Sequence, residues 1–267
     1  PAAPRLLAAL DEIGLAREQV DYLFLTHVHL DHAGGAGQLM QALPNARAVL
    51  HPRGAPHLID PTRLIAGSIQ EALYRQLYGE LIPIPAERVI VVEDGQRLQL
   101  GRRTFEFVDA PGHARHHHCP VDLDHRDVYS GDNFGICYRE FDTDRGPFML
   151  PTTTPVQFEP DALHATIDRL MSYQPKRILQ THFGPVTDLE RLARDLHAAI
   201  VELVRIARLH ADAPGRSARI EADMFQYFSV QLDEHGYTGD LARRHALLDE
   251  DVRLNTAGLD VWLNRVQ

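Results

Sequence analysis

Cysteine is scarce in this chain of 267 residues, which contains only Cys119 and Cys137. Two thiols are too few for a disulfide framework, so we expect both to be reduced in a cytoplasmic protein. No apolar run approaches the ~20 residues that a membrane-spanning helix needs. Residues 1–15 also lack the basic start and apolar middle of a signal peptide. The sequence therefore predicts no membrane partner.

Basic residues are outnumbered, because 27 Lys and Arg stand against 37 Asp and Glu, which gives a formal net charge of −10. Non-specific binding of nucleic-acid phosphates needs clustered Lys and Arg. We therefore expect no nucleic-acid partner and a small-molecule substrate. The hydrophobic fraction of 44% and the charged fraction of 24% are typical of globular proteins, and the chain can bury a large core in one or two domains.

Metal-binding side chains are concentrated in residues 23–35, which read LFLTHVHLDHAGG after an apolar run that predicts a buried strand. Imidazoles and carboxylates suit zinc, and also iron or manganese, whereas calcium prefers more oxygen ligands. Residues i and i+2 of an extended loop share a face, so His27 and His29 can chelate one ion. Asp31 and His32 then point away from that pair, toward a second ion about 3.5–4 Å off. The alternative is a polar surface loop.

The pattern His-x-His-x-Asp-His followed by Ala-Gly-Gly resembles the signature of the metallo-β-lactamase superfamily, which includes glyoxalase II and lactonases. Three later segments resemble the other ligand motifs of that superfamily, in the expected order: Ala110-Pro-Gly-His113, Ser130-Gly-Asp132 and Thr181-His182-Phe-Gly184. The resemblance covers residues 20–184. It implies seven ligands in two groups with one shared carboxylate: His27, His29 and His113; Asp31, His32 and His182; and the bridging Asp132.

The resemblance implies an α/β fold, an αββα sandwich followed by a helical extension. We place the catalytic domain at residues 1–186 and the extension at residues 187–267. Members of this family begin with strands that are absent here, since the sequence opens on a predicted helix at residues 4–15. Either the numbering begins partway into the natural protein, which we favour, or the chain departs from the family at its amino end.

Apolar periodicity predicts the remaining elements. We expect helices at residues 38–43, 62–78, 160–173, 187–209, 221–232, 238–248 and 250–266. We expect strands at residues 46–51, 89–92, 96–100, 104–108, 118–123, 127–130 and 177–180. An Asp94-Gly95 turn is expected to join the strand at 89–92 to the next one and so to open the second sheet. The carboxyl-terminal helices are expected to wall the substrate cleft and to contribute to a homodimer contact.

The resemblance implies a binuclear metal-dependent hydrolase in which a metal-bound hydroxide attacks an acyl substrate such as a lactone or thioester. Two divalent ions are expected, with zinc favoured and iron or manganese also suited. Asp31 is the candidate catalytic residue, because it can orient the nucleophile or pass its proton to the leaving group. Asp132 argues against a true β-lactamase, since antibiotic-cleaving members generally lack this aspartate. The alternatives are a mononuclear iron persulfide dioxygenase and a non-catalytic metal-binding protein.

Three residues are candidate substrate contacts, namely His57, Tyr138 and Phe148. His57 lies in a stretch that the resemblance places near the pocket mouth, although a solvated or supporting role is equally open. Phe148 belongs to a long irregular segment, residues 134–155, which is typical of a lid, with packing against helices as the alternative. Acyl-homoserine lactonases carry a tyrosine where this chain has Gly135, so that activity is not favoured. The roles of the consecutive histidines at 116–118 stay open.

Overall fold

The structure is a computed structural model that describes all residues except 1, 67–78, 155 and 267. The folded chain divides into two compact units. The first comprises Pro1–Asp109 and His116–Asp124, and the second comprises Ala110–Arg115 and His125–Gln267. We describe each unit by itself. The predicted domain boundary at residue 186 stays a prediction.

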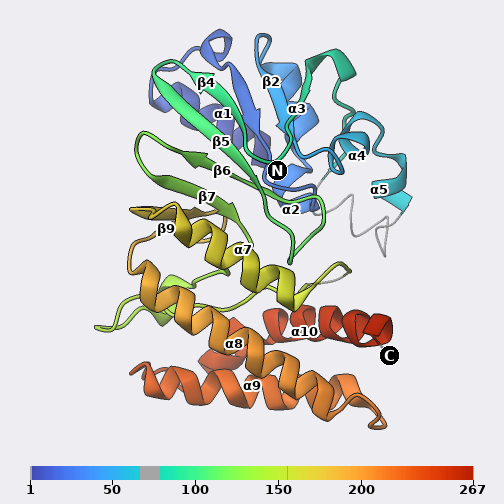
Figure 1. The fold of residues 1–267 in the computed structure, drawn as a ribbon, viewed down its shortest axis with the longest axis vertical. Helices are drawn as coiled ribbons and strands as arrows, with labels where there is room; N and C mark the ends of the chain where they lie inside the picture. The colour runs from blue at the N-terminus through green and yellow to red at the C-terminus, as the bar shows by residue number, and fades with distance from the viewer. Residues whose placement is uncertain (1, 67–78, 155, 267) are drawn as a thin grey trace. The chain divides into compact units, whose positions relative to one another are not determined.

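The first unit contains a parallel sheet of three strands in the order β1-β2-β3. These strands are β1 (Tyr22–Phe24), β2 (Arg47–Leu50) and β3 (Val89–Val91). The described helices of this unit are α1 (Ala2–Glu12), α2 (Leu30–Ala33), α3 (Ala36–Ala42), α4 (Ala55–Ile59) and α5 (Thr62–Ala66), together with the 3-10 turns Arg17–Gln19 and Ala86–Arg88. Helices α1 and α3 pack together, and both contribute apolar side chains to the core beneath the sheet (Figure 1). Beyond Ala66, the helix predicted at residues 62–78 lies outside the described residues.

The strand predicted at residues 89–92 exists, but its predicted place in the second sheet is wrong. Strand β3 pairs parallel with β2 in the first sheet, with Val49 opposite Ile90. The segment around Asp94 therefore connects the two sheets and is not a hairpin turn within one sheet. The alternation of apolar residues predicts that a segment is extended, but it contains no information about which strand becomes its partner.

Strands β4 (Gln96–Leu100), β5 (Arg103–Asp109) and β6 (His118–Asp122) also belong to the first unit and pair antiparallel in that order. The ring of Phe24 on β1 meets the rings of Phe105 and Phe107 on β5 edge-on, each at a centroid distance of 5.1 Å. Aromatic rings at this spacing fill the interior between two layers. The two sheets of this unit therefore face each other across an apolar core.

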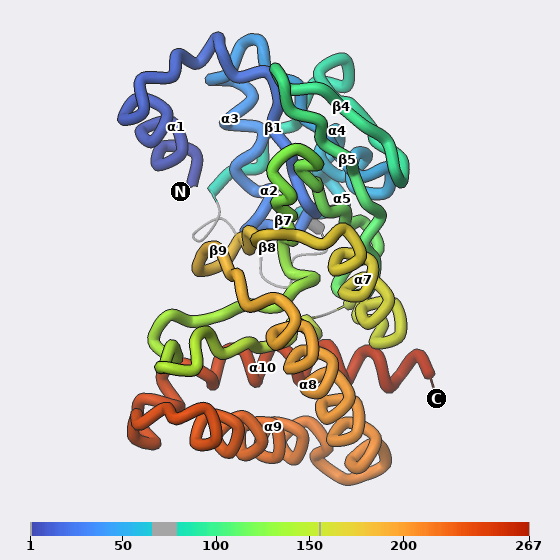
Figure 2. The backbone as a smooth tube through the Cα atoms, turned by 60° about the vertical axis from the view of Figure 1, so that its left-hand side comes forward, coloured from blue at the N-terminus to red at the C-terminus, as the bar shows by residue number. Residues whose placement is uncertain are grey.

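The second unit combines strands with the long helices. It contains β7 (Asp127–Gly131), β8 (Arg177–Gln180) and β9 (Pro185–Val186), together with α7 (Pro160–Ser172), α8 (Leu189–Leu209), α9 (Arg216–Glu234), α10 (Leu241–Val266) and the 3-10 turn Arg139–Phe141. Strand β8 runs parallel to β7 and antiparallel to β9. Of the two sheets of the fold, one holds β1 to β3 and the other β4 to β9. Figure 2 shows α8, α9 and α10 side by side, and buried apolar residues of all three helices form their core.

The two helices predicted at residues 238–248 and 250–266 form one continuous helix, α10. The prediction of a break at Asp249 was wrong because no proline or glycine stands there, so nothing interrupts the ladder of backbone hydrogen bonds. The helix begins after Asp240, whose carboxylate accepts a hydrogen bond from the backbone N–H of Arg243. Among the described residues, every helix is too short or too polar to cross a membrane.

Arg88 ties the carboxyl end of α3 to the first sheet. Its guanidinium donates hydrogen bonds to the carbonyl oxygens of Met40, Leu43 and Ala46, at 2.6, 2.5 and 2.6 Å. All three acceptor residues are buried. The last carbonyls of a helix have no partner within the helix, so a buried helix end needs donors from elsewhere. A planar guanidinium with five N–H groups can serve several carbonyls at once.

Replacing Arg88 with Ala should lower the free energy of unfolding by about 2–4 kcal/mol, because buried carbonyls lose charged donors. The measurement is urea unfolding followed by circular dichroism. The matched control is Arg47→Ala, since Arg47 is an exposed residue of the same unit. Equal stability losses in the two variants would contradict the assigned role of Arg88.

Candidate metal centre

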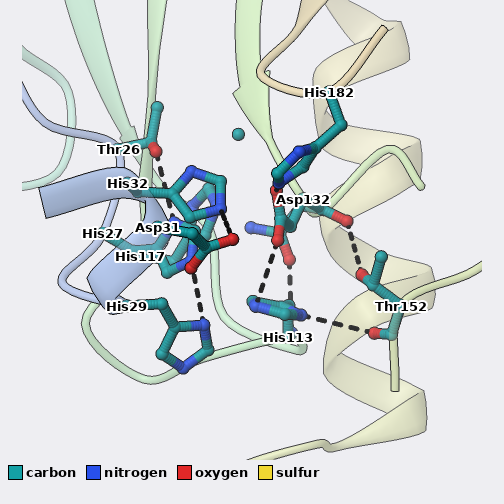
Figure 3. A network of polar contacts seen from close by, with 12 residues as sticks. Thr26, His27, His29, Asp31, His32, His113, His117, Asp132, Thr152 and His182 are labelled. Carbon is teal, nitrogen blue, oxygen red and sulfur yellow. Dashed lines mark hydrogen bonds and ion pairs between the residues drawn. The ribbon is translucent and has the colours of Figure 1, made fainter. Parts of the chain in front are cut away.

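The polar loop that follows β1 brings the side chains of His27, His29, Asp31 and His32 together (Figure 3). Nε2 of His27 and Nδ1 of His29 lie 3.0 Å apart, and Nε2 of His32 lies 3.3 Å from a carboxylate oxygen of Asp31. The backbone of His29 is extended, with φ −62° and ψ 150°, and helix α2 begins at the next residue. The imidazole of His32 also lies against that of His27, with ring centroids 4.0 Å apart, so the four side chains form one cluster. The predicted division of these donors between two ions stays a prediction.

These distances fit the chemistry of shared metal ligands. Two donors that each lie ~2.1 Å from a tetrahedral zinc ion are about 3.4 Å from each other. Both pairs in the loop are close to this spacing. His27 is buried, whereas the side chain of Asp31 is 47% exposed. Asp31 is therefore the acidic donor of this loop that solvent can reach.

The three consecutive histidines at 116–118 brace this loop. His116 accepts a hydrogen bond through Nδ1 from the backbone N–H of Val28, at 3.4 Å. The imidazole of His117 is buried and stacks on that of His27, with ring centroids 4.6 Å apart. His118 donates its backbone N–H to the carbonyl of Thr26 and its Nε2–H to the carbonyl of Leu25. Each of the three histidines thus makes a different contact with the loop. The sequence alone did not predict these contacts.

Burial lowers the pKa of His118 to about 3, and the nearby charge of His51 adds to this effect. The hydrogen bond to the Leu25 carbonyl acts in the opposite direction but is weaker. His118 is therefore neutral at neutral pH, with its proton on Nε2, because a carbonyl oxygen can only accept. The neutral imidazole of His118 thus holds Leu25, which directly precedes the loop that carries His27 and His29.

In the second unit, a glycine turn delivers His113. Gly112 has φ +128°, and a Cβ atom there would lie 2.4 Å from Cα of Leu163, so only glycine fits between the chain and helix α7. His113 donates its backbone N–H to the side-chain oxygen of Asn133 and its Nδ1–H to the carbonyl of Thr152, at 3.2 and 3.4 Å. These contacts leave Nε2 of His113 as the nitrogen that faces Asp132.

The carboxylate of Asp132 lies between two histidines of its own unit (Figure 3). One oxygen is 3.5 Å from Nε2 of His113, and the other oxygen is 3.8 Å from Nε2 of His182. Asp132 is 6% exposed, and its backbone carbonyl accepts a hydrogen bond from the hydroxyl of Thr152 at 2.7 Å. A carboxylate whose two oxygens face different imidazoles has the geometry of a bridge between two cations.

The sequence did not predict the contacts of Asn133 and Thr152 with these residues. Asn133 also donates from its amide nitrogen to the carbonyl of Ala110, at 2.7 Å, so it connects the turn before His113 to the loop after β7. Thr152 belongs to three consecutive threonines, 152–154, within the irregular segment of residues 134–155. No local pattern marks a backbone carbonyl that will meet an imidazole from another part of the chain.

The predicted substrate contacts lie in different surroundings. His57 is half-buried on α4. The hydroxyl of Tyr138 donates to the carboxylate of Asp251 at 2.6 Å, and burial raises the pKa of Tyr138. Phe148 packs against Phe141 and borders a cavity of about 260 Å³ within the second unit. Their contacts with substrate stay predictions.

Residues 1–182 match the family described as the metallo-β-lactamase superfamily, which covers well over half of the chain. The chain belongs to this superfamily. Its clustered histidine and aspartate side chains are consistent with metal binding.

Three curated relatives match part of the chain. The metallo-β-lactamase fold-containing protein ST1585 of Sulfurisphaera tokodaii is 27% identical over 175 residues, or 64% of this chain. A hydroxyacylglutathione hydrolase of Stenotrophomonas maltophilia is 33% identical over 132 residues, or 49% of this chain. The acyl-coenzyme A thioesterase MBLAC2 of Bos taurus is 28% identical over 120 residues, or 40% of this chain. The matches span 63%, 38% and 39% of the lengths of these relatives.

Two solved structures show the same fold. The metallo-β-lactamase family protein TTHA1429 from Thermus thermophilus has a TM-score of 0.66 at 19% identity, over 98% of this chain and 80% of that one. TTHA1623 in a di-iron-bound form has a TM-score of 0.50 at 29% identity, over 72% of this chain and 82% of that one. The predicted α/β metallo-β-lactamase fold with two sheets is therefore confirmed.

His118 should make the stability of the metal-depleted protein depend on pH. The pKa of His118 is about 3 in the folded state and near 6.5 in the unfolded state, so between these two pH values the unfolded chain binds this proton and the folded protein does not. The stability that neutral His118 contributes is fully present above pH 6.5. As the pH decreases from 7 to 5, the free energy of unfolding falls by about 2 kcal/mol. Replacement by Gln keeps an N–H donor for the Leu25 carbonyl without titrating.

We therefore expect His118→Gln to lose about 2 kcal/mol less unfolding free energy than the wild type between these two pH values. The measurement is urea unfolding in the presence of a chelator at both pH values. His125→Gln is the control, since His125 is exposed. Identical losses in His118→Gln and the wild type would show that His118 does not remain neutral in the folded protein.

Proposed function

We propose that this protein is a binuclear metal-dependent hydrolase that acts on an acyl substrate such as a lactone or thioester. The observation that carries the proposal is the position of Asp132, whose two oxygens face the Nε2 atoms of His113 and His182. An anion placed in this way suits two closely spaced cations. Membership of the superfamily and the relatives named as hydrolases support the same reaction class.

We propose that the two halves of the ligand set act together. His27, His29 and His113 would hold one ion, Asp31, His32 and His182 the other, and Asp132 both. The donor chemistry supports this assignment, because imidazoles and carboxylates are the ligands of zinc and iron. The relative TTHA1623 is known in a di-iron-bound form, which makes iron a candidate beside zinc.

The two ions, when bound, would lower the pKa of a shared water from 15.7 toward roughly 7 and polarise the acyl carbonyl. The protein supplies orientation and proton transfer. With Nδ1–H of His113 donating to the Thr152 carbonyl and Nδ1–H of His27 donating to the Thr26 hydroxyl oxygen, Nε2 of each ring would carry the lone pair that binds a metal. Asp31 would orient the attacking water or pass its proton to the leaving group, and the exposure of its carboxylate to solvent supports this role.

Thioesters are the substrates to test first. Two relatives are named as a hydroxyacylglutathione hydrolase and an acyl-coenzyme A thioesterase, although each match spans about two fifths of the relative. Lactones require attack on the same kind of acyl carbon and belong in the same assay. A persulfide substrate would indicate the alternative reaction, an oxygenation at a single iron.

The proposal predicts about two equivalents of zinc or iron in protein purified without a chelator, measured by elemental analysis. Activity should appear on thioesters or lactones, should disappear on treatment with a chelator and should return when metal is restored. One iron per chain together with oxygen-dependent turnover of a persulfide would contradict the proposal. Lack of bound metal would also contradict it.

Replacing Asp132 with Ala should remove one ion before the other, because each ion then keeps only its terminal ligands and loses the shared anion. We expect affinity for the more weakly held ion to fall at least ~10-fold and kcat/KM to fall by ~10² or more. Competition with a chromophoric chelator measures the affinity. Asp144→Ala is the control, since Asp144 is an exposed residue of the same unit. Retention of two tightly bound ions in Asp132→Ala would exclude the bridging role.

A further inference from the structure

The carboxyl-terminal helix α10 contacts the segment of residues 151–153 through the buried side-chain amide of Asn255. Asn255 is 3% exposed. Its side-chain oxygen accepts hydrogen bonds from the backbone N–H and the hydroxyl of Thr153, at 2.6 and 3.1 Å. Its amide nitrogen donates to the carbonyl of Pro151 at 3.1 Å. Asn255 therefore holds the backbone on both sides of Thr152.

Close packing adds to this attachment. A Cβ atom on Gly258 would lie 1.5 Å from the carbonyl oxygen of Thr153, so the helix backbone itself lies against the segment. Only a residue without a side chain permits such an approach. Gly258 is three residues after Asn255, and residues three or four apart share a helix face. One face of α10 thus fixes the position of residues 151–153.

Thr152 connects this held segment to two proposed ligands. Its carbonyl accepts the Nδ1–H of His113 at 3.4 Å, and its hydroxyl donates to the backbone carbonyl of Asp132 at 2.7 Å. The first bond fixes the ring orientation and tautomer of His113. The second fixes the loop that carries the Asp132 carboxylate. A shift of Thr152 would move both ligands.

The same helix face has a second attachment one turn earlier. Asp251, four residues before Asn255, accepts the hydroxyl of Tyr138 at 2.6 Å. The ring of Tyr138 lies 4.4 Å from the ring of Phe183, the residue after His182. The helix therefore holds segments next to all three proposed ligands of the second unit.

We propose that α10 is a positioning element of the metal centre and that Asn255 is the positioning residue for His113 and Asp132, acting through Thr152. This inference rests on the proposed function, because it takes His113 and Asp132 as metal ligands. Ligand geometry must be held within about 0.5 Å, and partners that orient ligating residues change metal affinity by 10–100-fold. The helical extension is then part of the metal centre and more than a cover.

The test compares metal binding in Asn255→Ala, the wild type and two controls, using the full chain depleted of metal. The probe is Co²⁺, because its absorption spectrum reports ligand geometry and competition with a chelator gives its affinity. Asn264→Ala is the matched control, since Asn264 is an exposed asparagine of the same helix. Val252→Ala truncates a buried apolar residue of α10 and controls for loss of stability alone.

We expect Asn255→Ala to weaken Co²⁺ affinity 10–100-fold and to change the spectrum. Asn264→Ala and Val252→Ala should leave both unchanged. Asn255→Asp keeps the acceptor for Thr153 and loses the donor to Pro151, so it should show a smaller effect, and it replaces the Ala variant if that fails to fold. Wild-type affinity and spectrum in both Asn255 variants, with two ions bound, would overturn the positioning role alone. A wild type that binds no second ion would overturn the proposed function itself.

Discussion

The carboxylate of Asp132, set between the imidazoles of His113 and His182, is the interaction on which the rest of the proposed site depends. A buried carboxylate is costly unless cations or strong donors face it. Divalent cations bound at this position would offset the charge of the carboxylate. The surrounding structure can be understood as the means of keeping this arrangement in place.

Buried side chains and backbone groups support the candidate ligands within each unit. His118 is held neutral by burial and by its bond to the Leu25 carbonyl, and His117 stacks on His27. In the second unit, Thr152 orients His113 and the Asp132 loop, while Asn255 holds the backbone around Thr152. Thr152 and Asn255 are uncharged and His118 is neutral, so they add no charge to the proposed site, whose negative charge would come from Asp31 and Asp132.

The sequence predicted those features that depend on local order and missed those that depend on distant partners. The spacing of His27, His29, Asp31 and His32 predicted that these donors lie close together, because neighbouring residues determine their own geometry. Their division between two ions stays a prediction. Apolar runs predicted most strands and helices for the same reason. The sheet partner of residues 89–91 could not be predicted, since β3 and β2 are separated by about forty residues.

The contacts of Arg88 and Asn255 could not be predicted from the sequence either. Nothing in the sequence around Arg88 indicates that its guanidinium donates hydrogen bonds to carbonyls at the end of α3. Asn255 appeared as a polar residue within a helical pattern, yet it is buried against a loop more than a hundred residues earlier in the chain. Contacts of this kind follow from the tertiary fold, and no pattern of neighbours encodes them.

A crystal structure of protein purified without a chelator, with anomalous scattering recorded at the absorption edge of the bound metal, tests the central claim most directly. We predict two peaks about 3.5–4 Å apart, with the Asp132 carboxylate between them and imidazole nitrogens at ~2.0–2.1 Å. A single peak, or two peaks without Asp132 as a shared ligand, would contradict the account.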